Sequence, residues 1–324
     1  MQDYSQNLFE DVKGQRFAVT VLESALKKKC IANAYLFSGP EGVGRKKTAL
    51  KFIEGIINES NNKLNAKRRL KEFNLPDLLW VEPTYLIQGN MIPKSKAEEE
   101  NVSKRIPPQI RLEQIKKIKD FLSKNPLEIK KGIVVIEEVE KINESGANAL
   151  LKTLEEPNKG IFILITNRKE HLLKTIVSRC QLVPFLRLNE SLIKEILTKG
   201  SNNEETINAL SENEKELISL ANGSPGELMK NIRFWNEIPK NIFEDLKSMP
   251  KDSLKNLSLA KQISEELDLE QQIWMIYWLQ NFIWVQSYNS RNIRRLEKLK
   301  SQLFSFVQPR LAWEIALLEI NFIN

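Results

Sequence analysis

The pattern of apolar and polar positions changes near residue 190 of the 324-residue chain. Before that point, short apolar runs typical of buried strands alternate with segments whose apolar residues recur at helical spacing. We expect strands at 34–38, 78–81, 132–136, 161–166 and 182–186, and helices at 17–27, 46–57, 110–122, 147–154 and 170–177. This alternation predicts an α/β domain with a parallel sheet.

Beyond residue 190 the strand pattern ends and helical spacing continues. We expect helices at 191–198, 205–210, 214–221 and 226–232, and a helical region over 254–323, after a joint marked by Pro239 and Pro250. The predicted domains are an α/β domain at 1–186, a small helical lid at 187–237 and an all-α domain at 238–324.

Two segments need a separate interpretation. Residues 88–102 lack periodicity and hold a charged cluster at 94–100, which predicts a surface insertion within 86–104. Trp274, Trp278 and Phe282 recur every four residues, a spacing that favours packing in a helical core over a base-stacking surface.

The composition is that of a globular protein, with 41% hydrophobic and 28% charged residues. Two cysteines, Cys30 and Cys180, and one histidine exclude a disulfide framework and a thiolate zinc site. We expect a cytoplasmic protein without a membrane partner, because neither a signal peptide nor a bilayer-spanning apolar segment is indicated. The net charge of +7 permits contact with nucleic acid or an acidic partner.

A glycine-rich loop lies between the expected strand 34–38 and helix 46–57. Residues 39–46 read GPEGVGRK, against the phosphate-binding pattern G-x-x-x-x-G-K-[ST]. Gly39, Gly42 and Gly44 would let backbone N–H groups surround phosphates. However, Arg45 occupies the lysine position, and Lys46 occupies the position whose hydroxyl holds Mg²⁺. We therefore expect a degenerate nucleotide site with weak ATP binding at best and no bound metal.

Three further residues belong to this candidate site. Glu137 and Glu138 end the run 132–136, where paired carboxylates can hold a metal ion and activate water. Carboxylates fixed by nearby Lys or Arg are the alternative, and both interpretations stay open. Thr166, at the end of 161–166, is the third candidate. Using Lys47 and Thr48 as the Lys-Thr pair would move both groups about half a helical turn away.

Five segments resemble the bacterial clamp-loader subunits of DNA polymerase III, which are AAA+ proteins. Residues 9–15 (FEDVKGQ) resemble F-x-D-V-x-G-Q, and residues 32–40 (ANAYLFSGP) resemble A-H-A-Y-L-F-x-G-P with Asn33 in place of His. Residues 148–157 (NALLKTLEEP) match N-A-L-L-K-x-L-E-E-P in full. Residues 175–180 (TIVSRC) resemble T-I-x-S-R-C, and 223–226 (GSPG) resemble the lid of the delta-prime branch.

This resemblance implies a delta-prime subunit that helps to load the sliding clamp onto primed DNA during replication. It implies a non-catalytic subunit of the DNA polymerase III holoenzyme, with the 238–324 region as its oligomerising collar. In the family, the Arg of S-R-C reaches a neighbouring subunit's nucleotide, so Arg179, beside Ser178, would be an arginine finger acting in trans. The implied partners are the gamma/tau and delta subunits, primer-template DNA and, indirectly, the sliding clamp.

Two alternatives remain. An ATP-hydrolysing motor of the gamma/tau type is disfavoured by Arg45, Lys46 and Gly226, because motors carry an Arg at the last position. A Holliday-junction helicase is disfavoured by residues 148–157 and by the helical C-terminal region. The family's zinc module is not expected, because no cysteine lies between the glycine loop and residue 136.

Overall fold

The computed structural model describes residues 8–59, 69–70, 75–97, 99–100, 102, 106–156, 160–200, 204–248, 252–305 and 307–320, without the side chains of 59, 198–200 and 204–212. The chain divides into two units, one formed by 1–100, 108–200 and 223–226 and the other by 101–107, 201–222 and 227–324. The three-domain division stays a prediction.

The first unit is built on a five-stranded sheet in the order β2-β5-β6-β1-β7. The strands are β1 (Ala34–Ser38), β2 (Leu78–Val81), β5 (Gly132–Ile136), β6 (Gly160–Thr166) and β7 (Gln181–Pro184). Every neighbouring pair is parallel, and Ser38 lies opposite Thr166. The expected parallel sheet is confirmed, and the carboxyl ends of β1, β5 and β6 meet at one edge.

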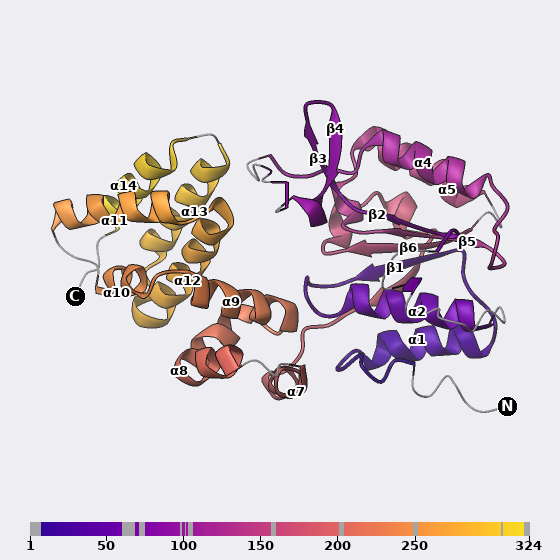
Figure 1. Ribbon diagram of the computed structural model, residues 1–324, viewed down its shortest axis with the longest axis horizontal. Coiled ribbons are helices and arrows are strands. Elements are labelled where there is room, and N and C mark those ends of the chain that lie inside the picture. The colour runs from indigo at the N-terminus through magenta and orange to yellow at the C-terminus, as the bar shows by residue number, and fades with distance from the viewer. Residues whose placement is uncertain are drawn as a thin grey trace. The chain divides into compact units, whose positions relative to one another are not determined.

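Helices cover both faces of this sheet (Figure 1). Helices α1 (Arg16–Lys27) and α2 (Arg45–Glu59) lie on one face, and α4 (Leu112–Leu122) and α5 (Glu144–Glu155) lie on the other. Ile118 of α4 and Leu150 of α5 are fully buried in a core cluster with the strands. Helix α7 (Glu190–Gly200) also belongs to this unit.

One prediction in this unit was incomplete and another was wrong. Residues 88–102 include part of a hairpin of β3 (Thr84–Ile87) and β4 (Asn90–Pro93), followed by η1 (Lys94–Lys96). Four-residue strands are too short to show alternation, and Gln88 and Gly89 take the left-handed φ angles of a tight hairpin turn.

The wrong prediction is the single helix at 170–177, which is split into η3 (Lys169–His171) and α6 (Lys174–Val177). Leu172, between them, has an extended backbone and is buried in the core. The turn η2 (Val139–Lys141) was not predicted.

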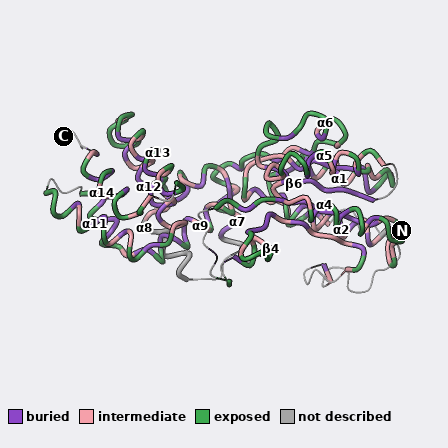
Figure 2. Tube along the Cα trace, turned by 90° about the horizontal axis from the view of Figure 1, so that it is seen from above, coloured by how far each residue is buried: buried purple, intermediate pink, exposed green. Residues whose placement is uncertain are grey.

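The second unit is helical. It contains α8 (Glu204–Ala221), all but the start of α9 (Pro225–Glu237), α10 (Lys240–Ser248), α11 (Ser253–Glu266), α12 (Leu269–Ser287), α13 (Ser290–Phe304) and α14 (Pro309–Glu319). Helix α8 joins the two helices expected at 205–210 and 214–221, with a kink at Asn213. Buried and exposed positions alternate along these helices, as amphipathic packing requires (Figure 2).

Aromatic side chains form part of the core of this unit. Trp278 is fully buried, and its ring centroid lies 5.0 Å from that of Phe243 and 6.4 Å from that of Trp235. Trp274 is 6% exposed and donates a hydrogen bond to Asn231. The expected core role of Trp274 and Trp278 is confirmed. Among the described residues, no helix has the length and hydropathy needed to cross a bilayer.

Candidate functional site

The loop between β1 and α2 has the backbone of a phosphate-binding loop. Gly42 and Gly44 have left-handed φ angles of 73° and 99°, which residues with a side chain rarely adopt. A Cβ on Gly39 would lie 2.3 Å from the carbonyl oxygen of Phe185. The glycines are therefore required by local geometry, and the loop leads into a helix N-terminus, where anions are favoured.

Arg45, at the lysine position, is engaged inside its own chain. It is 7% exposed, and its guanidinium donates hydrogen bonds to the carbonyl oxygen of Thr166 and to Oδ1 of Asn167. Burial lowers the pKa of Arg45, and the nearby carboxylates oppose that effect. The side chain therefore joins the start of α2 to the end of β6.

Lys46, at the hydroxyl position, forms an ion pair with Glu137. Lys46 Nζ lies 2.7 Å from Glu137 Oε1 and 5.1 Å from the ring centroid of Trp80. The indole Nε1 of Trp80 donates a hydrogen bond to the same carboxylate oxygen. An ammonium and an indole thus occupy the oxygen that would otherwise be available to a metal ion.

Glu138 is held by two lysines. Its Oε1 lies 2.7 Å from Lys94 Nζ, and its Oε2 lies 2.5 Å from Lys141 Nζ. Burial raises the pKa of the Glu138 carboxyl, but hydrogen bonds from Lys141 and Lys94 outweigh that effect, so the pKa lies below its ordinary value. For both glutamates, the structure supports carboxylates fixed by lysines rather than a metal-holding pair.

The segment 223–226 packs directly on the glycine loop. Ser224 Oγ donates to the carbonyl oxygen of Glu41 at 2.7 Å, and Gly226 N donates to that of Gly42 at 3.0 Å. A Cβ on Gly226 would lie 2.6 Å from Gly42 Cα. A longer side chain at residue 226 would therefore require this contact to open.

Ser178 and Arg179 lie at a different place, after α6. Ser178 Oγ donates to the carbonyl oxygen of Thr175 at 3.1 Å. Arg179 Nη1 donates to the same oxygen at 2.9 Å, and Nη2 lies 2.6 Å from Glu155 Oε1 at the end of α5. The Arg179 side chain is 37% exposed, so it is accessible while being held by an ion pair.

The residues present do not fit Mg²⁺-ATP in the usual way. Lys47 Nζ donates to the carbonyl oxygen of Asp11, and Thr48 Oγ1 donates to that of Gly44, so this pair does not replace the missing lysine and hydroxyl. Within the part of the chain that the structure describes, no group of three or more His, Cys, Asp or Glu side chains could hold a metal ion.

The structure adds site residues that the sequence did not single out. Trp80, Lys94 and Asn167 contact Glu137, Glu138 and Arg45 respectively, and Glu155 contacts Arg179. Trp80 and Asn167 lie at the carboxyl ends of β2 and β6, so strand-end position was a usable signal. Lys94 follows the hairpin that was missed, and nothing in its own pattern identified it.

The match to known families is extensive. Residues 14–189, more than half of the chain, match the family model described as "DNA polymerase III, delta subunit". The chain belongs to this family. Residues 191–320 match a second family, described as "Cyanobacterial DNA polymerase III delta prime, C-terminal domain". The chain is thus a member of the DNA polymerase III clamp-loader subunits.

Individual relatives cover part of the chain. The delta-prime subunit of Bacillus subtilis is 32% identical over 184 residues, which are 55% of this chain and 49% of that protein. The tau subunit of the same organism is 30% identical over 192 residues, 57% of this chain and 30% of that protein. The matched region therefore spans half or less of these relatives.

A solved structure supports the fold. A DNA polymerase III gamma subunit-related protein from Thermotoga maritima has a TM-score of 0.53 and 17% identity, and the match covers 91% of this chain and 97% of that one. At this identity the likeness shows the fold alone. The expected AAA+-like α/β domain followed by a helical region is confirmed.

Proposed function

We propose that this chain is a delta-prime-type clamp-loader subunit that acts in the cytoplasm and hydrolyses no ATP by itself. It would bind gamma/tau and delta subunits and primer-template DNA, and so help to load the sliding clamp. One observation carries this proposal: the chain's own residues engage the side chains at both degenerate positions. Arg45 contacts the end of β6, and Lys46 pairs with Glu137.

A motor subunit of the gamma/tau type is the second candidate, because the identity to tau is close to the identity to delta-prime. Titration of Mg²⁺-ATP into the purified chain, together with a steady-state hydrolysis assay, separates the two. We expect weak binding and turnover at background rate. Turnover that disappears in Glu138→Gln would establish the motor instead.

We further propose that Arg179 acts in trans on the ATP site of a neighbouring motor subunit. Its polar contacts are with α5 and α6, it is accessible, and its planar fork can make two parallel hydrogen bonds to phosphate oxygens. A guanidinium in that position stabilises the charge that spreads over the transferred phosphoryl group. The ion pair with Glu155 would be exchanged for the neighbour's nucleotide on assembly.

The reconstituted clamp loader tests this role. Arg179→Ala should assemble normally and lower DNA-stimulated ATP turnover at the affected site by a factor on the order of 10³–10⁵. Arg179→Lys should restore little, because an ammonium lacks the bidentate geometry.

Two variants serve as controls. Glu155→Gln removes the ion pair but keeps the guanidinium, and Lys174→Ala removes an exposed cation from α6. Both should keep turnover near the wild-type rate. If Arg179→Ala loads clamps as fast as wild type, the trans role is wrong.

A further inference from the structure

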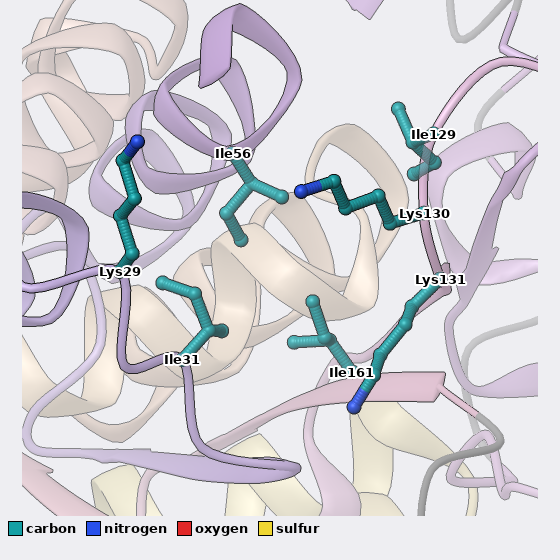
Figure 3. A pocket seen from close by; sticks show the side chains of 7 residues that line it. All are labelled: Lys29, Ile31, Ile56, Ile129, Lys130, Lys131 and Ile161. Atoms are coloured by element: carbon teal, nitrogen blue, oxygen red, sulfur yellow. The ribbon is translucent and has the colours of Figure 1, made fainter. Parts of the chain in front are cut away.

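A small pocket, whose lining side chains are shown in Figure 3, lies at the amino ends of the strands, opposite the end that carries the glycine loop. Ile31 precedes β1, residues 129–131 precede β5 and Ile161 is near the start of β6, so these residues gather at the amino ends of parallel strands. The pocket has a volume of about 250 Å³. This is below the roughly 300–1,000 Å³ of sites for drug-sized ligands, and it suits one large side chain.

The apolar part of the lining is aliphatic. It consists of isoleucines from four segments: Ile31, Ile56, Ile129 and Ile161. Ile161 is 5% exposed, whereas the other three are half-buried. An apolar group placed among them would remove further isoleucine surface from water, which is favourable.

Among the described residues of the lining, the polar side-chain groups are ammonium groups, from Lys29, Lys130 and Lys131. Lys29 and Lys130 are exposed and form no ion pair with the described residues. Lys131 Nζ donates to Asn33 Oδ1 at 3.3 Å. In Figure 3 the Lys130 side chain extends toward Ile56, which places a positive charge beside the apolar lining. A complementary ligand must therefore combine negative charge with an apolar group.

The loop that carries two of these lysines is fixed in place. The buried carboxylate of Asp77 accepts hydrogen bonds from the backbone N–H groups of 127, 128 and 129, at 2.8, 2.6 and 3.0 Å. Binding would thus not have to order this loop first, which lowers the entropic cost of association.

We propose that this pocket binds an acidic segment of a partner protein. One large aliphatic or aromatic side chain would insert among the isoleucines, and flanking Asp or Glu carboxylates would contact the three lysines. Single-stranded nucleic acid is a poorer match, because such sites use aromatic side chains to stack bases and the described residues of this lining include no aromatic side chain. This role does not depend on ATP binding or hydrolysis at the glycine loop.

Fluorescence anisotropy with the full chain and a labelled peptide of sequence DEELFEDE tests the proposal at low ionic strength. We expect saturable binding that weakens about tenfold when Leu and Phe of the peptide are replaced by Ser. Lys29→Glu combined with Lys130→Glu should weaken binding at least about tenfold, because attraction to the carboxylates becomes repulsion.

The matched control is Lys116→Glu combined with Lys117→Glu, which makes the same change in net charge on the exposed face of α4. The affinity of this control variant for the peptide should stay within about twofold of the wild-type affinity, since its charges are screened from a distant ligand. Equal loss in both double variants, no loss with the Ser peptide, or no binding of any peptide would overturn the proposal. Tighter binding of an eight-residue oligothymidylate, lost in the pocket variant alone, would overturn the assigned partner class.

Discussion

At the residue scale, the candidate nucleotide site differs from a working one in two cationic side chains, Arg45 and Lys46, which bind groups of their own chain. The sequence alone identified the substitutions at Arg45 and Lys46, because the glycine pattern fixes those positions. It could not identify what they bind, since Thr166, Asn167 and Glu137 come from distant strands that only the folded sheet brings together.

Arg45→Ala should destabilise the fold rather than only alter nucleotide binding. It removes two hydrogen bonds made by a buried cation and leaves the Thr166 and Asn167 oxygens without that donor. We expect the free energy of unfolding to fall by ~2 kcal/mol in urea denaturation. Lys47→Ala, at an exposed neighbouring position, should change it by less than ~0.5 kcal/mol. Equal effects would show that Arg45 is not a structural cation.

Glu138→Gln should have a pH-dependent effect on stability. Burial raises the pKa of Glu138, but hydrogen bonds from Lys141 and Lys94 outweigh this effect, so the pKa lies below its ordinary value of 4.5. The ionised group therefore stabilises the fold above pH 4.5, and this contribution is lost as the pH falls through the lowered pKa. The difference in unfolding free energy between wild type and variant should be largest near pH 7 and shrink below pH 4.5. A difference that is constant between pH 7 and pH 3 would contradict the ion-pair role.

At the scale of elements, the strands of the parallel sheet were the most predictable. Strands β1, β2 and β5 have the predicted bounds because each is a continuous apolar run, although β2, at the edge of the sheet, is only partly buried. The hairpin of β3 and β4 was missed because its strands are short and partly exposed. The single helix predicted at 170–177 was wrong because periodicity alone does not reveal that the backbone at Leu172 is extended so that its side chain reaches the core.

Asp77 is the residue on which the loop before β5 depends most directly. Asp77→Ala would leave three backbone N–H groups without their acceptor. We expect a loss of about 2–3 kcal/mol in unfolding free energy, measured by urea denaturation. Asp120→Ala, at an exposed position on α4, should cost less than ~0.5 kcal/mol. A similarly small effect at Asp77 would mean that the loop is held by other contacts.

At the scale of the whole molecule, the helical unit presents an apolar face that its own core does not use. Leu311, Ile315 and Leu318 follow one another along α14 at helical spacing and are 47%, 37% and 44% exposed. We propose that this face contributes to assembly of the collar. Truncation of the chain near Pro239 is a poor test of this role, because it would remove Phe243 and Trp278, which pack against Trp235.

Replacing Leu311, Ile315 and Leu318 together with Gln is the better test. The unit should stay folded, because the removed side chains are largely exposed, whereas co-elution with the other clamp-loader subunits should weaken at least about tenfold. Leu254→Gln, at a position that is 74% exposed on α11, is the control and should assemble normally. Unchanged co-elution of the triple variant would exclude this face from the interface.

The position of Trp80 has an optical consequence. The other five tryptophans all lie at or beyond residue 235, in the helical unit. Trp80 alone reports on the sheet, where its indole lies against the Lys46–Glu137 ion pair. Subtracting the fluorescence emission of Trp80→Phe from that of wild type therefore gives the emission of Trp80 alone. This emission should change when the Lys46–Glu137 ion pair separates. An added nucleotide, or a neighbouring subunit arriving during assembly, could be followed by its emission without any attached dye.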